Sequence, residues 1–285
     1  MSRMMRLYYY AILGAMGGVI GWQISNVLGL SFLSSVFLSE IVVGALIGLS
    51  IGLLIGLSDG LFARNFVQML RSGMFSGLLG ALGGAIGLPI AEGLFQLLGG
   101  GTLSRTIGWG LFGLLIGLAV GITGGSQVWK PVVGGTVGGI MGGIFLEGAR
   151  VWLADPLIGK ALGLGLLGAS VGIFIALILF LLSRAWFEVT AGKLKGTEFI
   201  LDKFLTSSGP SAYIGSSPLK SDIVLPDPDI SPQHALLTGK DTHFSLKDMS
   251  TQGTFINNKR IELSNLRNQQ VIKLGNTTMV YRERR

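Results

Sequence analysis

The stretch that decides the fold of the C-terminal third is YIGSSPLKSDIVLPDPDISPQHALLTGKDTHFSLKDMSTQGTFINN, residues 213–258. In this stretch short apolar runs alternate with Gly, Pro, Asp and Asn, a pattern typical of β-strands joined by tight loops. Similar runs lie on both sides, at intervals typical of an all-β sandwich. The predicted strands are 199–204, 212–214, 223–225, 234–237, 244–247, 254–256, 260–262, 271–274 and 278–282.

The chain before this region has a different composition. All but seven of the 46 glycines lie before residue 191, among charge-free apolar runs long enough to cross a bilayer. We predict an all-α, glycine-rich membrane bundle of about six helices, near 5–26, 38–58, 72–92, 104–124, 130–149 and 157–184. The fifth is expected to be the weakest span because glycines dilute its apolar residues. The expected parts are a transmembrane domain over 1–187, a linker over 188–197 and a β-domain over 198–285.

The glycines recur in a fixed order. GAMGGVIG at 14–21 returns as GALGGAIG at 80–87 and, more loosely, as GTVGGIMG at 135–142. The helix that follows each of these also carries similar glycines, so we interpret the membrane part as three tandem helical hairpins. Glycines four residues apart share one helix face and let neighbouring backbones approach closely, as in a glycine zipper. We expect a tightly packed bundle, with a possible homo-oligomer through the same faces.

Acidic residues occupy equivalent positions in two of these repeats. Eight residues beyond the second glycine of each GG pair stand Asn26, Glu92 and Glu147. The two carboxylates either mark an ion or proton path or lie at the outer water interface, and we favour the interface. The distribution of Lys and Arg places both termini in the cytoplasm if six helices cross the membrane.

The C-terminal motifs resemble the forkhead-associated (FHA) domain family. They are Tyr213-Ile214-Gly215, then Ser231-Pro232-Gln233-His234, then the stretch 253–258, which reads GTFINN. The resemblance covers about 90 residues and implies a β-sandwich that binds phosphothreonine peptides through its loops. It also implies roles for individual residues. The phosphopeptide-binding candidates are Ser216, Ser217, Ser231, Thr251 and Gln252, and the structural candidates are Gly215, His234, Gly253 and Asn258.

The chain departs from the family pattern at the binding positions. Ser216 stands where the family has a phosphate-binding arginine, Pro232 replaces an Arg or Asn, and Gln252 replaces the asparagine that holds the peptide backbone. A phosphate dianion is bound best by a guanidinium or several converging donors, and these positions offer neutral groups. The sequence therefore leaves two alternatives open, which are phosphothreonine binding and docking of an unmodified protein.

Other function classes find little support. The chain has no cysteine and two histidines, which exclude thiolate chemistry and a His-rich metal site. We find no catalytic constellation and predict neither an enzyme nor a cofactor. The net charge of +7 is not concentrated in a basic run, so we expect no nucleic-acid partner. We predict an integral membrane protein, of a bacterial inner membrane, whose FHA-like domain recruits a phosphorylated or unmodified protein to the bilayer. The alternatives are a channel or transporter regulated by this domain, and a structural membrane scaffold.

Overall fold

The computed structural model describes residues 3–30, 35–63, 65–97, 99, 102–124, 127–205, 211–240 and 243–284. The chain divides into two compact units. One contains residues 6–60 and 68–181 and is helical, and the other contains residues 182–285 together with 1–5 and 61–67. Each unit is described separately below.

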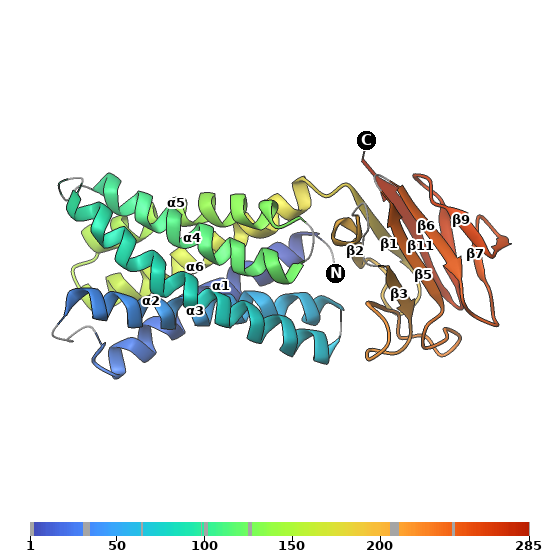
Figure 1. The fold of residues 1–285 in the computed structure, drawn as a ribbon, viewed down its shortest axis with the longest axis horizontal. Helices are drawn as coiled ribbons and strands as arrows, with labels where there is room; N and C mark the ends of the chain where they lie inside the picture. Colours follow the sequence, from blue (N-terminus) through green and yellow to red (C-terminus); the bar gives the residue numbers. More distant parts are fainter. Residues whose placement is uncertain are drawn as a thin grey trace. The chain divides into compact units, whose positions relative to one another are not determined.

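Six helices form the first unit, as the sequence predicts (Figure 1). They are α1 (Arg3–Val27), α2 (Val36–Ala63), α3 (Phe66–Leu97), α4 (Thr102–Gly124), α5 (Trp129–Trp152) and α6 (Pro156–Leu181). Within the described residues, five of them, α2 to α6, are long and apolar enough to cross a membrane. The expected weak span, α5, is the least apolar of these five but still qualifies, whereas α1 does not. The three tyrosines Tyr8–Tyr10 and Gln23 make α1 more polar than the other helices.

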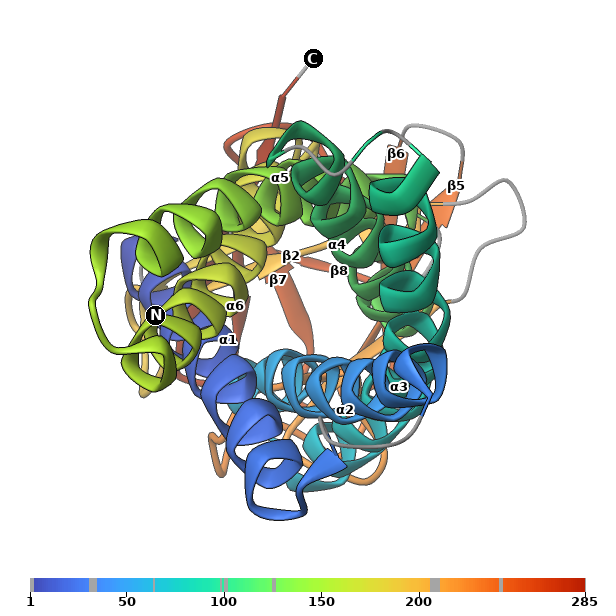
Figure 2. The same ribbon diagram turned by 90° about the vertical axis from the view of Figure 1, so that its left-hand side faces the viewer.

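The helices close into a ring, in which each packs against the next and α6 packs against α1 (Figure 2). Glycines stand at every one of these six interfaces, where an added Cβ would collide with the neighbouring helix. The pairs are Gly17 with Ile51, Gly44 with Gly84, Gly83 with Leu115, Gly113 with Gly135, Gly134 with Ile175, and Gly168 with Gly14. Such contacts let helices associate where lipid removes the hydrophobic incentive. These glycine contacts are thus made within one chain.

The bundle has small residues inside and large apolar residues outside. On α3, Gly73, Gly77, Gly80, Gly84 and Gly87 are buried. The outer face of the same helix carries exposed apolar side chains, which are Met74, Leu78, Leu82, Ile86 and Ile90. A broad exposed apolar face is costly in water and is the normal arrangement in lipid. The structure thus indicates a membrane protein.

The second unit is a β-sandwich of two sheets (Figure 1). The six-stranded sheet has the order β2-β1-β11-β10-β7-β8, and the five-stranded sheet has the order β4-β3-β5-β6-β9. Among the strands of the described residues, only β3 and β4 pair in parallel. The strands are β1 (Ala185–Ala191), β2 (Glu198–Ile200), β3 (Ala212–Gly215), β4 (Ile223–Val224), β5 (Ala235–Lys240), β6 (His243–Asp248), β7 (Thr254–Ile256), β8 (Lys259–Ile261), β9 (Leu263–Asn265), β10 (Val271–Leu274) and β11 (Thr277–Glu283).

Strand β1 is the main feature that the sequence patterns did not predict. It lies between β2 and β11 and pairs antiparallel with both. Phe187 of β1 is fully buried and meets the ring of Tyr281 edge to face, with 6.0 Å between the centroids. Tyr281 in turn meets Phe244 of the opposite sheet at 6.2 Å. These three aromatic side chains join the two sheets, so β1 is an integral part of the core.

Candidate functional site

The predicted binding residues lie in loops at the ends of β3, β5 and β6, and backbone hydrogen bonds join these loops. The Ser216 N–H donates to the Ser231 carbonyl (3.0 Å), and the Met249 N–H donates to the His234 carbonyl (2.9 Å). Gly215 ends β3 where the backbone of Pro232 passes so close that a Cβ would collide with its carbonyl oxygen. The close approach explains why the early strand must end in glycine.

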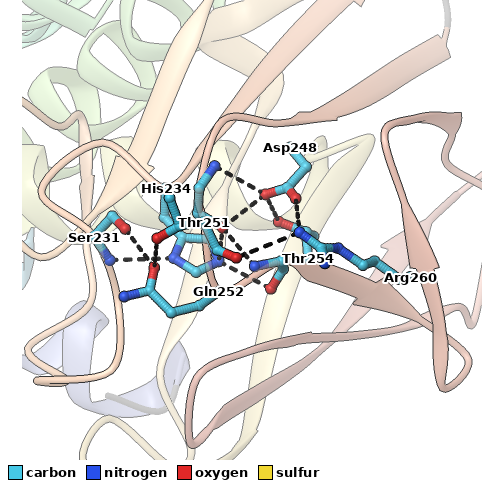
Figure 3. A network of polar contacts seen from close by, with 9 residues as sticks. Ser231, His234, Asp248, Thr251, Gln252, Thr254 and Arg260 are labelled. Carbon is cyan, nitrogen blue, oxygen red and sulfur yellow. Dashed lines mark hydrogen bonds and ion pairs between the residues drawn. The ribbon is translucent and has the colours of Figure 1, made fainter.

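Ser231, Thr251 and Gln252 come together at one point of this surface (Figure 3). The Ser231 hydroxyl donates to Gln252 Oε1 at 2.7 Å, and the Thr251 hydroxyl donates to the same oxygen at 3.3 Å. Thr251 and Gln252 are exposed, and Ser231 is partly exposed. Two hydroxyl donors from separate loops therefore converge on a single acceptor atom that is open to solvent.

His234 lies beneath this point and is fully buried. Its Nδ1 accepts a hydrogen bond from the Ser231 N–H (3.2 Å). Nε2 faces the Gly253 carbonyl (3.2 Å) and the Ser250 hydroxyl (3.1 Å). Because Nδ1 accepts, the ring is neutral and carries its proton on Nε2. Burial lowers the pKa of His234 below its usual 6.5, while the Gly253 carbonyl and the Asp248 and Asp227 charges act in the opposite direction.

Asp248, which was not among the predicted site residues, holds the Thr251–Gln252 loop from the other side (Figure 3). Its Oδ1 accepts hydrogen bonds from the Ser250 N–H (3.1 Å), the Ser250 hydroxyl (2.9 Å) and the Thr254 hydroxyl (2.9 Å). Burial acts to raise the pKa of Asp248, but these hydrogen bonds outweigh it and lower the pKa. Gly253 closes the loop with a φ of +89°, a conformation that a side chain disfavours.

A second carboxylate, Asp227, anchors the loop that carries Ser231. Its oxygens accept from the Asp229 N–H (3.1 Å), the Asn276 N–H (2.9 Å) and the Thr277 hydroxyl (3.1 Å). Burial opposes ionisation here too, yet these donors lower the pKa of Asp227. The loop between β4 and β5 is therefore tied to the turn between β10 and β11.

Ser216 and Ser217 do not join the converging hydroxyls. The Ser216 hydroxyl donates to the Ile230 carbonyl at 2.7 Å, so the residue at the family's arginine position supports a loop. Ser217 is partly exposed, and its backbone carbonyl accepts from the Lys220 and Ser221 N–H groups. In the described part of the chain its hydroxyl makes no hydrogen bond that would orient it. Asn258 has a φ of +67° in the turn between β7 and β8.

Arg260 supplies a cation that the sequence analysis missed (Figure 3). Its guanidinium donates to the Thr251 carbonyl (3.4 Å) and lies 4.0 Å from Asp248 Oδ2, while the side chain remains 58% exposed. The sequence signal that could have found it is the pair Asn257-Asn258, because Asn tolerates positive φ in a two-residue hairpin turn. Both residues have positive φ in the structure. That turn sets Arg260 opposite Phe255 in the β7–β8 register and brings it back over the loop.

These groups can hold an oxyanion but offer little for catalysis. Two hydroxyls, one guanidinium and a solvent-facing acceptor position suit a ligand that accepts hydrogen bonds. Among the described residues no group of three or more His, Asp or Glu side chains is arranged to hold a metal.

Comparisons with known proteins identify the family of the β-sandwich. The family model of the FHA domain matches residues 212–275. The FHA domain of CT664 from Chlamydia trachomatis is 33% identical, with a TM-score of 0.32, and the match covers 36% of this chain and 100% of that chain. The FHA-1 domain of Mycobacterium tuberculosis Rv1747 is 21% identical, covering 36% of this chain and 99% of that chain, with a TM-score of 0.28.

A third solved structure is the MEK1 FHA domain in complex with a HOP1 phosphothreonine peptide. It is 20% identical, covering 36% of this chain and 100% of that chain, with a TM-score of 0.30. A search of curated proteins found no match. The family match and the 33% identity over the whole CT664 domain concern the β-sandwich and not the helices. The C-terminal domain of this chain therefore belongs to the FHA family, whose members are phosphoprotein-interaction modules.

Proposed function

We propose that the FHA domain binds a phosphothreonine-containing protein and that the helical bundle holds this complex at a membrane. The observation that carries the proposal is the convergence of the Ser231 and Thr251 hydroxyls on one exposed acceptor, 2.7 and 3.3 Å away. The acceptor is at present the Gln252 amide oxygen. A phosphate oxygen in the same place would accept both hydrogen bonds and, being charged, would accept them more strongly.

Binding then requires the Gln252 side chain to turn away. Its position on the surface leaves it free to do so, because it is exposed. Without ligand, the Gln252 amide oxygen accepts the hydrogen bonds of the two hydroxyls. When ligand is bound, the amide is available to the peptide backbone. Gln252 thus has the same task as the asparagine that it replaces, with one additional methylene for reach.

Arg260 provides the positive charge that Ser216 cannot. Its guanidinium is next to the Thr251 carbonyl and more than half exposed, and its contact with Asp248 is long at 4.0 Å. A loosely held, exposed ion pair contributes little to stability, so the guanidinium can be redirected at small cost. We propose that it swings onto the phosphate, supplying the charge-assisted hydrogen bonds that the family obtains from an earlier arginine.

We propose that the FHA domain lies in the cytoplasm of a bacterium, with the helices in the inner membrane. Five candidate spans support membrane anchoring. The first helix supports a sixth crossing, because it completes the ring between α6 and α2 along its glycine face. Six crossings return the C-terminal domain to the side on which the chain begins.

The test is binding of the full chain, in detergent micelles, to a phosphothreonine peptide library with unphosphorylated peptides as control. We expect selective binding that Ser231→Ala weakens by about tenfold, the value of one hydrogen bond to a charged group. Ser217→Ala is the matched control, since that hydroxyl is turned to no partner in the described residues. Equal binding of phosphorylated and unmodified peptides, or an unaffected Ser231→Ala variant, would overturn the proposal.

A further inference from the structure

The helical unit contains a cavity of about 500 Å³ to which all six helices contribute. It lies at the end of the bundle where α1, α3 and α5 end and where α2, α4 and α6 begin. Cavities that bind small molecules typically measure roughly 300–1,000 Å³. We call it the polar chamber, because its lining includes Asn26, Glu40, Glu92, Arg105, Arg150 and Lys160.

The positions that the glycine pattern singled out meet at this chamber. Asn26 and Glu92 line it, and Glu147 holds two of its arginines. Glu147 is 8% exposed and accepts from Arg105 (3.4 Å) and Arg150 (3.1 Å). Glu147 is thus a buried, ion-paired acid, and it lies five residues before the end of α5. Ionisable groups inside a membrane bundle are costly and usually functional.

The charges around the chamber are balanced. Arg105, Arg150 and Lys160 carry three positive charges, and Glu40, Glu92 and Glu147 carry three negative charges. Glu147 offsets only part of the charge of its two arginines. Lys160, Glu40 and Glu92 form no ion pair within the described residues, although Glu40 interacts electrostatically with Glu92, Arg150 and Lys160. The Glu92 carboxylate accepts one hydrogen bond, from Gln96 (3.0 Å).

Buried apolar side chains follow the chamber toward the middle of the bundle. Ile47 of α2 lines it, and the residues one and two turns deeper on the same helix face, Ile51 and Ile55, are fully buried. Phe112 and Ile116 of α4 are likewise fully buried. Packed apolar side chains therefore occupy the bundle beyond the chamber, which favours a binding pocket over an open channel.

We propose that the polar chamber binds a small zwitterion that carries an ammonium group and an oxyanion. The ammonium would lie between the Glu40 and Glu92 carboxylates, and the oxyanion would meet Lys160 and the free edge of the Arg150 guanidinium. A chamber with no net charge favours a ligand with no net charge, whereas a simple ion would leave one set of groups without a counter-charge. Spans of this length reach the membrane–water interface near their ends, so the zwitterion is either a dissolved solute of amino-acid type or a phosphatidylethanolamine headgroup.

The test uses the full chain, purified without lipid in a neutral maltoside detergent, and isothermal titration calorimetry. The zwitterionic probes are alanine, γ-aminobutyrate and sn-glycero-3-phosphoethanolamine, which differ in charge spacing. Ethylamine and acetate are the single-charge controls. We expect saturable binding of at least one zwitterion, at least tenfold tighter than either control.

Variants assign the binding to the chamber. Glu92→Gln and Lys160→Gln each remove one charge without changing size much and should weaken binding about tenfold. Arg71→Gln, at the opposite end of α3, should leave it unchanged, and elution on size exclusion confirms that each variant is folded. The proposal would be overturned if no zwitterion bound saturably, if ethylamine or acetate bound equally well, or if the Glu92 and Lys160 variants bound like the native chain. Binding of alanine or γ-aminobutyrate identifies a dissolved solute, whereas binding of glycerophosphoethanolamine alone, with competition from phosphatidylethanolamine, identifies the headgroup.

Discussion

At the scale of single residues, Arg260 decides whether this FHA domain has a cation for phosphate. Replacing it with glutamine should weaken phosphothreonine peptide binding at least tenfold, because a hydrogen bond to a charged group contributes roughly 1.5–3 kcal/mol. Lys259→Gln is the matched control, as it removes the same charge from the neighbouring exposed position. Equal losses for the two variants in a fluorescence-anisotropy titration would show a general charge effect instead of a specific contact.

His234 gives the domain a pH dependence of stability. Its pKa is lowered in the folded state, chiefly by burial, so the unfolded chain takes up a proton first as the pH falls. The stability that neutral His234 provides is present above pH 6.5 and is lost as the pH falls below it. Protonation also removes the acceptor of the Ser231 N–H. The pKa values of Asp227 and Asp248 are lowered from 3.8, so the stability that their carboxylates contribute is lost only in more acidic solution.

Hydrogen exchange of residues 231–253 in the full chain measures this effect. Protection should decline between pH 7 and pH 5 in the native chain, and the decline should be absent in a His234→Asn variant, which cannot take up the proton. Parallel pH profiles for the two proteins would contradict the assigned neutral state.

Residue types predicted only part of the binding surface. Ser231 and Thr251 were identified from their place in the motifs, and the structure brings their hydroxyls together. Ser216 was identified in the same way but donates to the Ile230 carbonyl, a direction that only the loop conformation determines. Arg260 lay outside every motif, and its place depends on the register of the β7–β8 hairpin.

At the scale of elements, we predict that a foldable domain begins with strand β1. Sequence patterns missed it because residues 185–191 follow the apolar run of α6 after only a few polar residues. A protein of residues 182–285 should fold, whereas one of residues 191–285 should not, since it lacks Phe187 and leaves a gap between β2 and β11. Circular dichroism and a cooperative unfolding transition distinguish the two. A folded 191–285 protein would show that β1 is dispensable.

The helix contacts were easier to predict, because glycine at four-residue spacing has few other uses in a membrane helix. Gly84→Ala places a methyl group against the Gly44 carbonyl and should destabilise the bundle by roughly 1–3 kcal/mol, as overpacking does. Gly93→Ala on the same helix meets open space and should be neutral or slightly stabilising. Thermal unfolding of the full chain in detergent measures both, and equal effects would contradict the packing.

At the scale of the whole molecule, the number of crossings determines which side of the membrane the FHA domain occupies. The chain contains no cysteine, so single introduced cysteines report accessibility without background. With six crossings, Ala154→Cys in the α5–α6 loop should react with an impermeant maleimide in intact spheroplasts, and Lys195→Cys only after lysis. The reverse pattern would place the FHA domain outside the cytoplasm and separate it from cytoplasmic kinases.

The central claim is that this membrane protein recruits a partner through phosphothreonine. The most direct measurement is the dissociation constant of a library-selected peptide for the full chain in proteoliposomes, with and without its phosphate. We predict binding at least tenfold tighter with phosphate, a difference of about 1.4 kcal/mol, which phosphatase treatment abolishes. Equal dissociation constants for the two forms would contradict the claim and leave the FHA domain as a docking module for unmodified proteins.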